Sequence, residues 1–312
     1  MPAPPPSALV PTRVLASAPS LPTWPGTPIP LDSARSLNNF WDGLDLAFPK
    51  FDEPFSVAVP LAGPVNDLLG EAERLAPWLE ADNAKIAAAL DRAAALARTT
   101  RAGRRAFAEA ERVLAEQGRT LPVLVQALGS NYGEYDYIAK NMRLHKALFE
   151  KGREADLAGT LVHELTHVVQ HTQGVPSNAL EMEIEAHLQD LDMLLELGLK
   201  PPPHTFARQA LDALAESPKK FIALLQAAVP GTVFLGDSSF EDIDDQLEDD
   251  LAEHTRRAAH SKASAGLVPA IERDIDLLRT PEGRASYRAF SKRVLSLLRR
   301  RAKSASKSVS GL

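Results

Sequence analysis

The sequence predicts an α+β protein that is predominantly helical and contains one short antiparallel sheet. Three observations lead to this expectation. Much of the chain after residue 65 is rich in Ala, Leu and charged residues, which favour helices. Two runs in the middle, Leu121–Leu128 and Tyr137–Leu148, have the character of strands. Directly after them, two segments repeat apolar residues every three or four positions, as amphipathic helices do.

The composition indicates one or two globular domains and excludes several classes of protein. The chain has 312 residues, of which 45% are hydrophobic and 24% are charged, enough for a sizeable core. Its net charge of −6 favours no nucleic-acid partner. The absence of cysteine excludes disulfides and thiolate metal ligands. No apolar run approaches the roughly 18 residues of a membrane span, so none is expected.

Residues 1–30 contain ten prolines, and we expect them to form a flexible, Pro-rich arm. They lack a cationic start followed by an uninterrupted apolar stretch, so we do not expect a Sec signal. The expected location is the cytoplasm, or outside the cell after export by a specialised secretion system.

Residues 31–118 are expected to form a mainly helical N-terminal region. Aromatic and turn residues alternate first, with a short strand expected at Phe55–Leu61. Residues 65–117 then predict two or three helices, broken near Pro77 and Thr99–Gly103. Gly118 ends this region, and the central core is expected over residues 119–200.

The expected strand pair comes next. Leu121–Leu128 contains the β-branched Val123 and Val125, and Gly129–Gly133 is rich in turn residues. Side-chain character alternates along Tyr137–Leu148, as expected of a half-buried strand. The pair stands directly before the helix that carries the most informative motif.

That helix is predicted over Leu157–Thr172 and contains the motif H-E-x-x-H as His163, Glu164 and His167. The two histidines lie one turn apart on the face opposite the apolar stripe. This spacing allows both imidazoles to reach one Zn²⁺ while the glutamate reaches a water beside it. The motif therefore predicts a zinc-dependent hydrolase with one zinc per chain and Glu164 as general base.

A third ligand is expected on the following helix, predicted from about Ala179 to Leu197 after a tight break. The short connection makes the two helices antiparallel neighbours. Three glutamates flank the apolar stripe near its start, and the sequence does not choose cleanly among Glu181, Glu183 and Glu185. We favour Glu185 and keep Glu183 as a close alternative. The others would be solvated acids at a helix N-terminus.

His171 stands one turn beyond His167 but is a poor third ligand. The outer histidines would lie about 12 Å apart along the helix axis, which suits tetrahedral zinc badly. We interpret His171 as a residue of the cleft wall. A donor is also needed to stabilise negative charge during hydrolysis. The candidates are His171, His187, His204, Tyr132, Tyr135 and Tyr137.

These residues resemble a gluzincin, a member of the thermolysin-like superfamily of zinc peptidases. The resemblance covers about residues 120–198 and implies zinc ligands at His163 and His167 and a general base at Glu164. It implies a third ligand within Glu183-Ile184-Glu185-Ala186, and a sheet edge beside the motif helix that binds extended peptide. The run His163–Gln170 is also similar to small bacterial metallopeptidases, some of them attached to secreted toxins.

One position departs from the gluzincin pattern. In that family an acid four residues after the ligand glutamate often holds the first histidine. Here the position is Gln189 counted from Glu185, or His187 counted from Glu183. Either side chain is able to hydrogen-bond an imidazole.

Residues 201–312 are expected to form a C-terminal helical region with a basic tail. Pro201–Pro203 marks the boundary, and residues 204–228 are predicted to be helical. Asp237–Ser239 caps an acidic helix, whose carboxylates we interpret as a solvated face because they lack the spacing of a calcium loop. Thr280–Glu282 begins the final helix, which ends in basic residues.

Two functions remain open from the sequence. The first is a zinc peptidase that acts on a protein or peptide substrate. The second is a non-catalytic interaction or structural protein that retains a zincin-like metal-binding fold. Glu164 favours the first, because a scaffold has no need of a general base. The sequence gives no oligomeric state.

Overall fold

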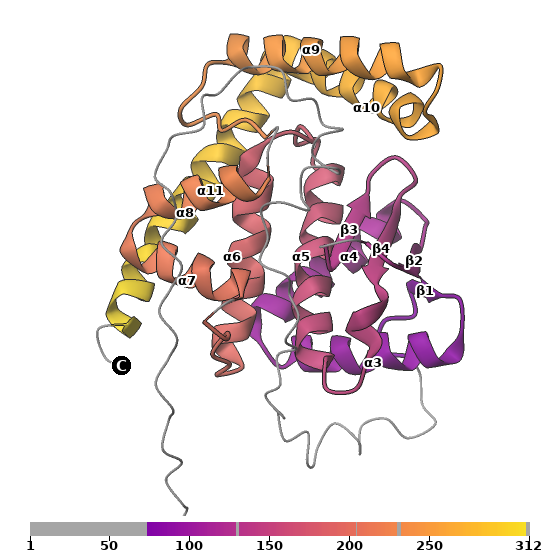
Figure 1. The fold of residues 1–312 in the computed structure, drawn as a ribbon, viewed down its shortest axis with the longest axis vertical. Coiled ribbons are helices and arrows are strands. Elements are labelled where there is room, and N and C mark those ends of the chain that lie inside the picture. Colours follow the sequence, from indigo (N-terminus) through magenta and orange to yellow (C-terminus); the bar gives the residue numbers. More distant parts are fainter. Residues whose placement is uncertain (1–73, 129–130, 204, 230–231, 310–312) are drawn as a thin grey trace, which may run out of the picture. The chain divides into compact units, whose positions relative to one another are not determined.

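The computed structural model describes residues 74–309, except residues 129–130, 204 and 230–231. All of these belong to one compact unit of the chain. They form an α+β structure that is predominantly helical (Figure 1), which confirms the predicted fold class. The Pro-rich arm of residues 1–30, the strand expected at Phe55–Leu61 and His204 lie outside the described residues.

The sheet is mixed, and not purely antiparallel as predicted. Its strand order is β1-β2-β4-β3, and β2 pairs in parallel with both β1 and β4. Only the pair of β3 and β4 is antiparallel. The strands are β1 (Leu79–Ala81), β2 (Leu121–Gln126), β3 (Gly133–Asp136) and β4 (Asn141–His145).

The reversal between β3 and β4 explains the error. The second strand was predicted to begin at Tyr137, which lies in the turn. Asp136 accepts hydrogen bonds from the backbone N–H groups of Ile138 and Ala139, and Lys140 takes a φ of 54°. This Asx turn reverses the chain without Gly or Pro, and it leaves β4 parallel to β2. The short 3₁₀ helix η2 (Lys146–Phe149) follows β4.

Two helices of the N-terminal region pack against the motif helix. They are α3 (Ala84–Arg98) and α4 (Arg101–Glu116), and both contact α5. Thr100 accepts a hydrogen bond from the backbone N–H of Gly103 and caps α4, at the break that the sequence predicts.

The motif helix α5 (Glu154–Thr172) and its successor α6 (Leu180–Glu196) lie side by side (Figure 1). The apolar stripe of α5 is buried in a core shared with the sheet, α3 and α4. Most of the apolar residues of α6 belong to a second core, shared with the C-terminal helices. The two helices therefore meet at the boundary of two cores.

The C-terminal helices are α7 (Phe206–Glu216), α8 (Pro218–Ala228), α9 (Phe240–Ala258), α10 (Lys262–Arg279) and α11 (Pro281–Val309). Helix α11 contacts α6, α7 and α8, while α9 and α10 pack on each other (Figure 1). Ser239 caps α9 as predicted. The expected basic tail continues the helix, and Arg301 pairs with Asp192 of α6 at 2.5 Å.

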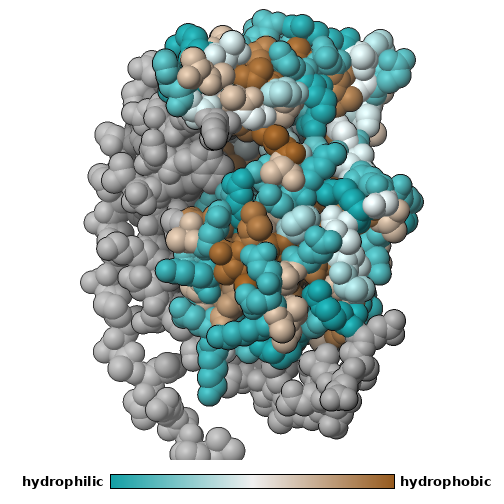
Figure 2. All heavy atoms as spheres, turned by 90° about the vertical axis from the view of Figure 1, so that its right-hand side faces the viewer, coloured by the Kyte–Doolittle hydropathy of each residue, from teal (hydrophilic) through white to brown (hydrophobic). Residues whose placement is uncertain are grey.

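The surface on the sheet side is mostly hydrophilic. Hydrophobic side chains show beneath the α9–α10 pair at the top and again lower down (Figure 2). Within the described ranges, no helix has both the length and the apolar character needed to cross a bilayer.

Candidate metal centre

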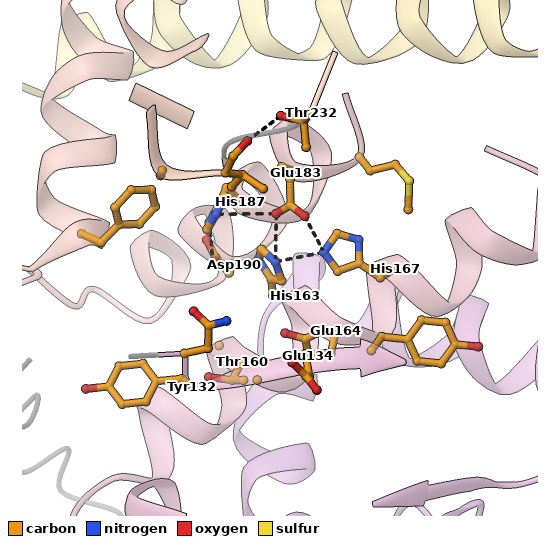
Figure 3. A pocket seen from close by; sticks show the side chains of 18 of the residues that line it. Tyr132, Glu134, Thr160, His163, Glu164, His167, Glu183, His187, Asp190 and Thr232 are labelled. Carbon is orange, nitrogen blue, oxygen red and sulfur yellow. Dashed lines mark hydrogen bonds and ion pairs between the residues drawn. The ribbon is translucent and has the colours of Figure 1, made fainter. Parts of the chain in front are cut away.

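The polar face of α5 opens into a cavity of about 460 Å³ (Figure 3). His163, Glu164 and His167 all line this cavity, together with residues of β3, α6, α7, α9 and α10. The opposite face of α5 is fixed by fully buried apolar side chains such as Leu161 and Leu165. The helix period therefore presents the two histidines to one space, and Glu164 between them reaches the same space.

Two imidazoles and one carboxylate converge in this cavity. The Nε2 atoms of His163 and His167 are 3.1 Å apart. One carboxylate oxygen of Glu183 lies 3.5 Å from His163 Nε2, and the other lies 3.5 Å from His167 Nε2. Ligand atoms that surround a tetrahedral zinc at about 2.0–2.1 Å are themselves about 3.4 Å apart. The donor set is therefore suited to one metal ion (Figure 3).

The sequence favoured Glu185 as the third ligand. That prediction is wrong, because the carboxylate of Glu185 does not lie beside the histidines. Its carboxylate accepts hydrogen bonds from the Arg293 guanidinium and the Gln170 amide. Residues two apart in a helix point about 200° away from each other, so Glu183 and Glu185 cannot share a face. The alternative, Glu183, is the carboxylate that joins the pair.

Neither remaining glutamate is solvated, contrary to expectation. Glu185 is 4% exposed and Glu181 is fully buried. The carboxylate of Glu181 accepts hydrogen bonds from the hydroxyls of Tyr287 and Ser291. Because both partners lie on α11, Glu181 holds that helix against α6.

Asp190 supports the first histidine, a contact that the sequence did not reveal. Its carboxylate lies 3.5 Å from His163 Nδ1 and 3.4 Å from His187 Nδ1. Glu183, His187 and Asp190 follow the i, i+4, i+7 spacing of one helix face, so this periodicity could have found Asp190. The side chains of His163, His187 and Asp190 form a second group close enough for a metal, and there the Nδ1 atom of His163 lies 3.5 Å from Asp190.

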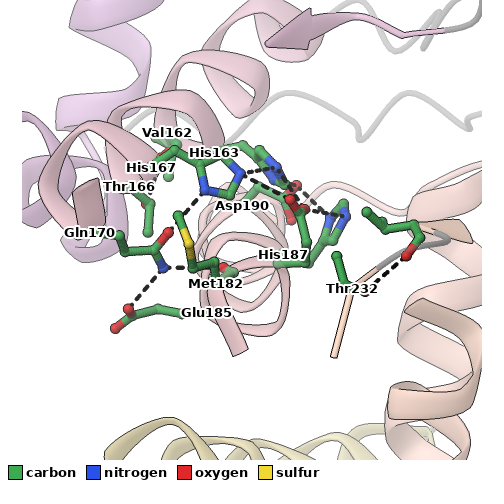
Figure 4. A network of polar contacts seen from close by, with 12 residues as sticks. Val162, His163, Thr166, His167, Gln170, Met182, Glu185, His187, Asp190 and Thr232 are labelled. Carbon is green, nitrogen blue, oxygen red and sulfur yellow. Dashed lines mark hydrogen bonds and ion pairs between the residues drawn. The ribbon is translucent and has the colours of Figure 1, made fainter. Parts of the chain in front are cut away.

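Gln170 holds the second histidine (Figure 4). Its Nε2 donates to the backbone carbonyl of Met182 at 3.1 Å and to Glu185 at 3.0 Å. Its Oε1 therefore accepts, and lies 2.9 Å from His167 Nδ1. This arrangement assigns the proton of His167 to Nδ1 and leaves the lone pair of Nε2 facing Glu183. Glu185 thus acts on the centre indirectly, through Gln170.

Burial dominates the acid–base properties of the motif. It raises the pKa of Glu164 to about 8, and the carboxylates of Glu183 and Glu134 add to that rise against the opposing effect of His163. It lowers the pKa of His167 to about 4. Burial also acts to lower the pKa of His163, but Asp190 and Glu183 outweigh it and hold this pKa well above its ordinary value. Glu164 is 4% exposed, and its Oε2 has no hydrogen-bond partner within the described part of the chain.

Gly133 allows β3 to approach Glu164 closely. A Cβ at this position would lie 2.5 Å from Thr160 Cγ2 and 2.8 Å from Glu164 Oε1. Both distances are shorter than real contacts, so any side chain here displaces Glu164 or the strand. Strand β3 is the last strand of the described sheet on the side of β4, and it contacts α5.

The other predicted cleft residues also line the cavity, and His187 lies beside the donor cluster, with its ring centroid 4.5 Å from that of His163. His171 accepts a hydrogen bond at Nδ1 from Arg273 and stacks near Tyr137, with ring centroids 5.7 Å apart. Burial lowers the pKa of His171 to about 4. It is therefore a wall residue, as predicted. Tyr132, Tyr135 and His187 line the same cavity.

No protein-family model matches this chain, and no curated protein or solved structure is significantly similar to it. The resemblance to gluzincins stays a prediction that rests on the motif.

Proposed function

We propose that this protein is a zinc-dependent peptidase whose metal is held by His163, His167 and Glu183. The observation that carries the proposal is the convergence of these three donors within 3.5 Å of one another, beside a buried glutamate. Three protein ligands of the His₂Glu type leave a fourth position open, as catalytic zinc sites require. Structural zinc sites are closed by four protein ligands, whereas among the described residues this group contains three.

When bound, zinc supplies a Lewis acid that polarises a carbonyl and lowers the pKa of a water. Glu164 then acts as the general base: it takes a proton from the attacking water and later gives it to the leaving amine. Burial raises the pKa of Glu164, which helps its carboxyl to hold that proton between the two events. Asp190 and Gln170 orient the two histidines through their Nδ1 atoms.

A peptide is the substrate that best suits the surroundings of Glu164. Strand β3 ends the described sheet, and an extended peptide can add to such an edge through backbone hydrogen bonds. Gly133 brings the start of this strand against Glu164. A peptide paired with β3 would thus carry its amide groups past the general base.

Metal content tests the ligand assignment. We expect about one zinc per chain by elemental analysis in the parent protein, and loss of it in His167→Ala. His171→Ala is the matched control, because His171 lies one turn further along the same helix and outside the donor cluster. A parent protein that takes up no zinc when incubated with it, or a His167→Ala variant that retains it, contradicts the proposal.

Activity tests the general base separately. Glu164→Gln should retain zinc and lose peptide hydrolysis by a factor of about 10²–10⁴. A variant that cleaves peptides as fast as the parent would overturn the mechanism. Zinc binding by a parent protein that cleaves no peptide would instead favour the non-catalytic alternative.

A further inference from the structure

The cavity that contains the candidate metal centre also reaches helices α9 and α10. There its wall is formed by Leu247 and Asp250 of α9 and by Leu267 and Ile271 of α10. Three of these four side chains are aliphatic. They are distant in sequence from the motif, yet they share one cavity with it.

Asp250 is an unusual residue for such a wall. It is 5% exposed, and one carboxylate oxygen accepts a hydrogen bond from Gln246 at 3.1 Å. The other oxygen, Oδ2, is buried without a hydrogen-bond partner in the part of the chain that the structure describes. No ion pair to Asp250 occurs there either. A buried carboxylate without a cation is costly, and such groups commonly mark binding sites.

The charge of the whole cavity favours a cationic ligand. Among the described residues, its lining carries six carboxyl groups and one Arg or Lys side chain, Arg153, which pairs with Asp156. Glu134 pairs with Arg143 from outside the cavity, and Glu183 and Asp190 face histidines. Asp250 is left without a positive partner among the described residues. The carboxylates of the lining are Glu134, Asp156, Glu164, Glu183, Asp190 and Asp250.

We propose that Asp250 recognises a lysine or arginine side chain of the substrate. The aliphatic stem of such a side chain would pack on Leu247, Leu267 and Ile271, and its cationic end would supply the partner that Asp250 Oδ2 lacks. This assignment of substrate class rests on the proposed peptidase function. An anionic side chain in the same place would meet an excess of negative charge.

Peptide binding tests this recognition without requiring hydrolysis. The probes are octapeptides of Ala and Gly, acetylated and amidated at their ends, with one lysine placed at each position in turn. Matched peptides carry norleucine, which keeps the aliphatic stem and lacks the charge. The protein is the zinc-loaded Glu164→Gln variant, and binding is measured by calorimetry.

At one position we expect lysine to bind about tenfold more tightly than norleucine. Adding Asp250→Asn should reduce this ratio to about one and leave the norleucine peptide unchanged. Asp249→Asn is the matched control: it removes the same charge from the next residue, which is exposed, and should keep the preference. A thermal melt confirms that each variant is folded.

Equal binding of lysine and norleucine peptides at every position, or a preference that survives Asp250→Asn, would overturn the proposal. A third set of peptides with free N-termini distinguishes the source of the cation. If only a free terminus gives the Asp250-dependent gain, the lysine assignment is wrong and the residue recognises a terminal amine. Failure of the peptidase proposal would appear instead in the zinc content and peptide hydrolysis of the parent protein, and neither of these is the readout of this binding experiment.

Discussion

Individual side chains decide which carboxylate belongs to the centre. The sequence placed two histidines on one helix face with a glutamate between them, and in the structure all three line one cavity. The sequence could not choose between Glu183 and Glu185, because the choice depends on how α6 is rotated against α5. That rotation is set by distant residues, such as Arg293 of α11, which pairs with Glu185.

The two glutamates should therefore respond differently to substitution. Glu183→Gln removes a charged donor from the cluster and should abolish tight zinc binding. Glu185→Gln leaves the three donors in place and removes the charge that faces Arg293 and Gln170, so we expect a loss of about 10- to 100-fold in zinc affinity. Titration against a competing chelator measures both. A larger loss in Glu185→Gln than in Glu183→Gln would return the ligand role to Glu185.

Gly133 is expected to matter for activity and not for metal binding. In Gly133→Ala the new Cβ would overlap Thr160 and Glu164, so the general base must shift. We expect peptide hydrolysis to fall at least about tenfold, because small misplacements of reacting groups are costly. Zinc content should stay at the parent level. Gly266→Ala is the control, because its Cβ would meet only Ile138, at 3.9 Å. An unchanged rate in Gly133→Ala would show that β3 yields without moving Glu164.

At the level of elements, helices were predicted well and strands poorly. Helices α5 and α6 follow from their own apolar periodicity, and their boundaries agree with expectation within a few residues. Strand β1 was missed, because its sequence Leu-Glu-Ala favours a helix and only its pairing with β2 makes it a strand. The β3–β4 turn was missed because it depends on one aspartate.

That turn makes a prediction for Asp136. Asp136→Ala removes two hydrogen bonds to the backbone of Ile138 and Ala139, and an ion pair with Arg143. We expect the free energy of unfolding to fall by about 1–3 kcal/mol, measured by urea denaturation. Asp245→Ala, at an exposed position of α9, should change it by less than about 0.5 kcal/mol. Equal effects of the two substitutions would mean that the turn does not depend on the Asp136 side chain.

At the scale of the molecule, the cavity lies where two hydrophobic cores meet, and no local pattern in the sequence predicts it. The sequence suggested that the acids of α9 form a solvated face. Most of them are exposed, but the structure buries Asp250, because it shares the stripe of Ile243 and Leu247 that packs inward. The apolar periodicity of a helix predicts which of its faces is buried. Only the assembled fold shows what that face packs against.

Burying Asp250 should make global stability depend on pH. Burial raises its pKa from 3.8 to about 6, with Asp249 and Glu253 adding to the rise. Between about pH 4 and pH 6 the folded chain binds this proton more tightly than the unfolded chain, so stability falls as pH rises, by up to about 3 kcal/mol in all. Asp250→Asn should remove this contribution to the pH dependence of the unfolding free energy. The variant should therefore be more stable than the parent at pH 7. Urea denaturation from pH 4 to pH 8 measures it. If the unfolding free energies of the two proteins changed with pH in parallel, that result would contradict the raised pKa of Asp250.

The most direct test of the central claim is the position of zinc in a crystal of the zinc-loaded protein, located by anomalous diffraction. The account predicts one ion about 2.0–2.1 Å from His163 Nε2, His167 Nε2 and a carboxylate oxygen of Glu183. An ion bound instead by His163, His187 and Asp190, or no ion at either group, would contradict it.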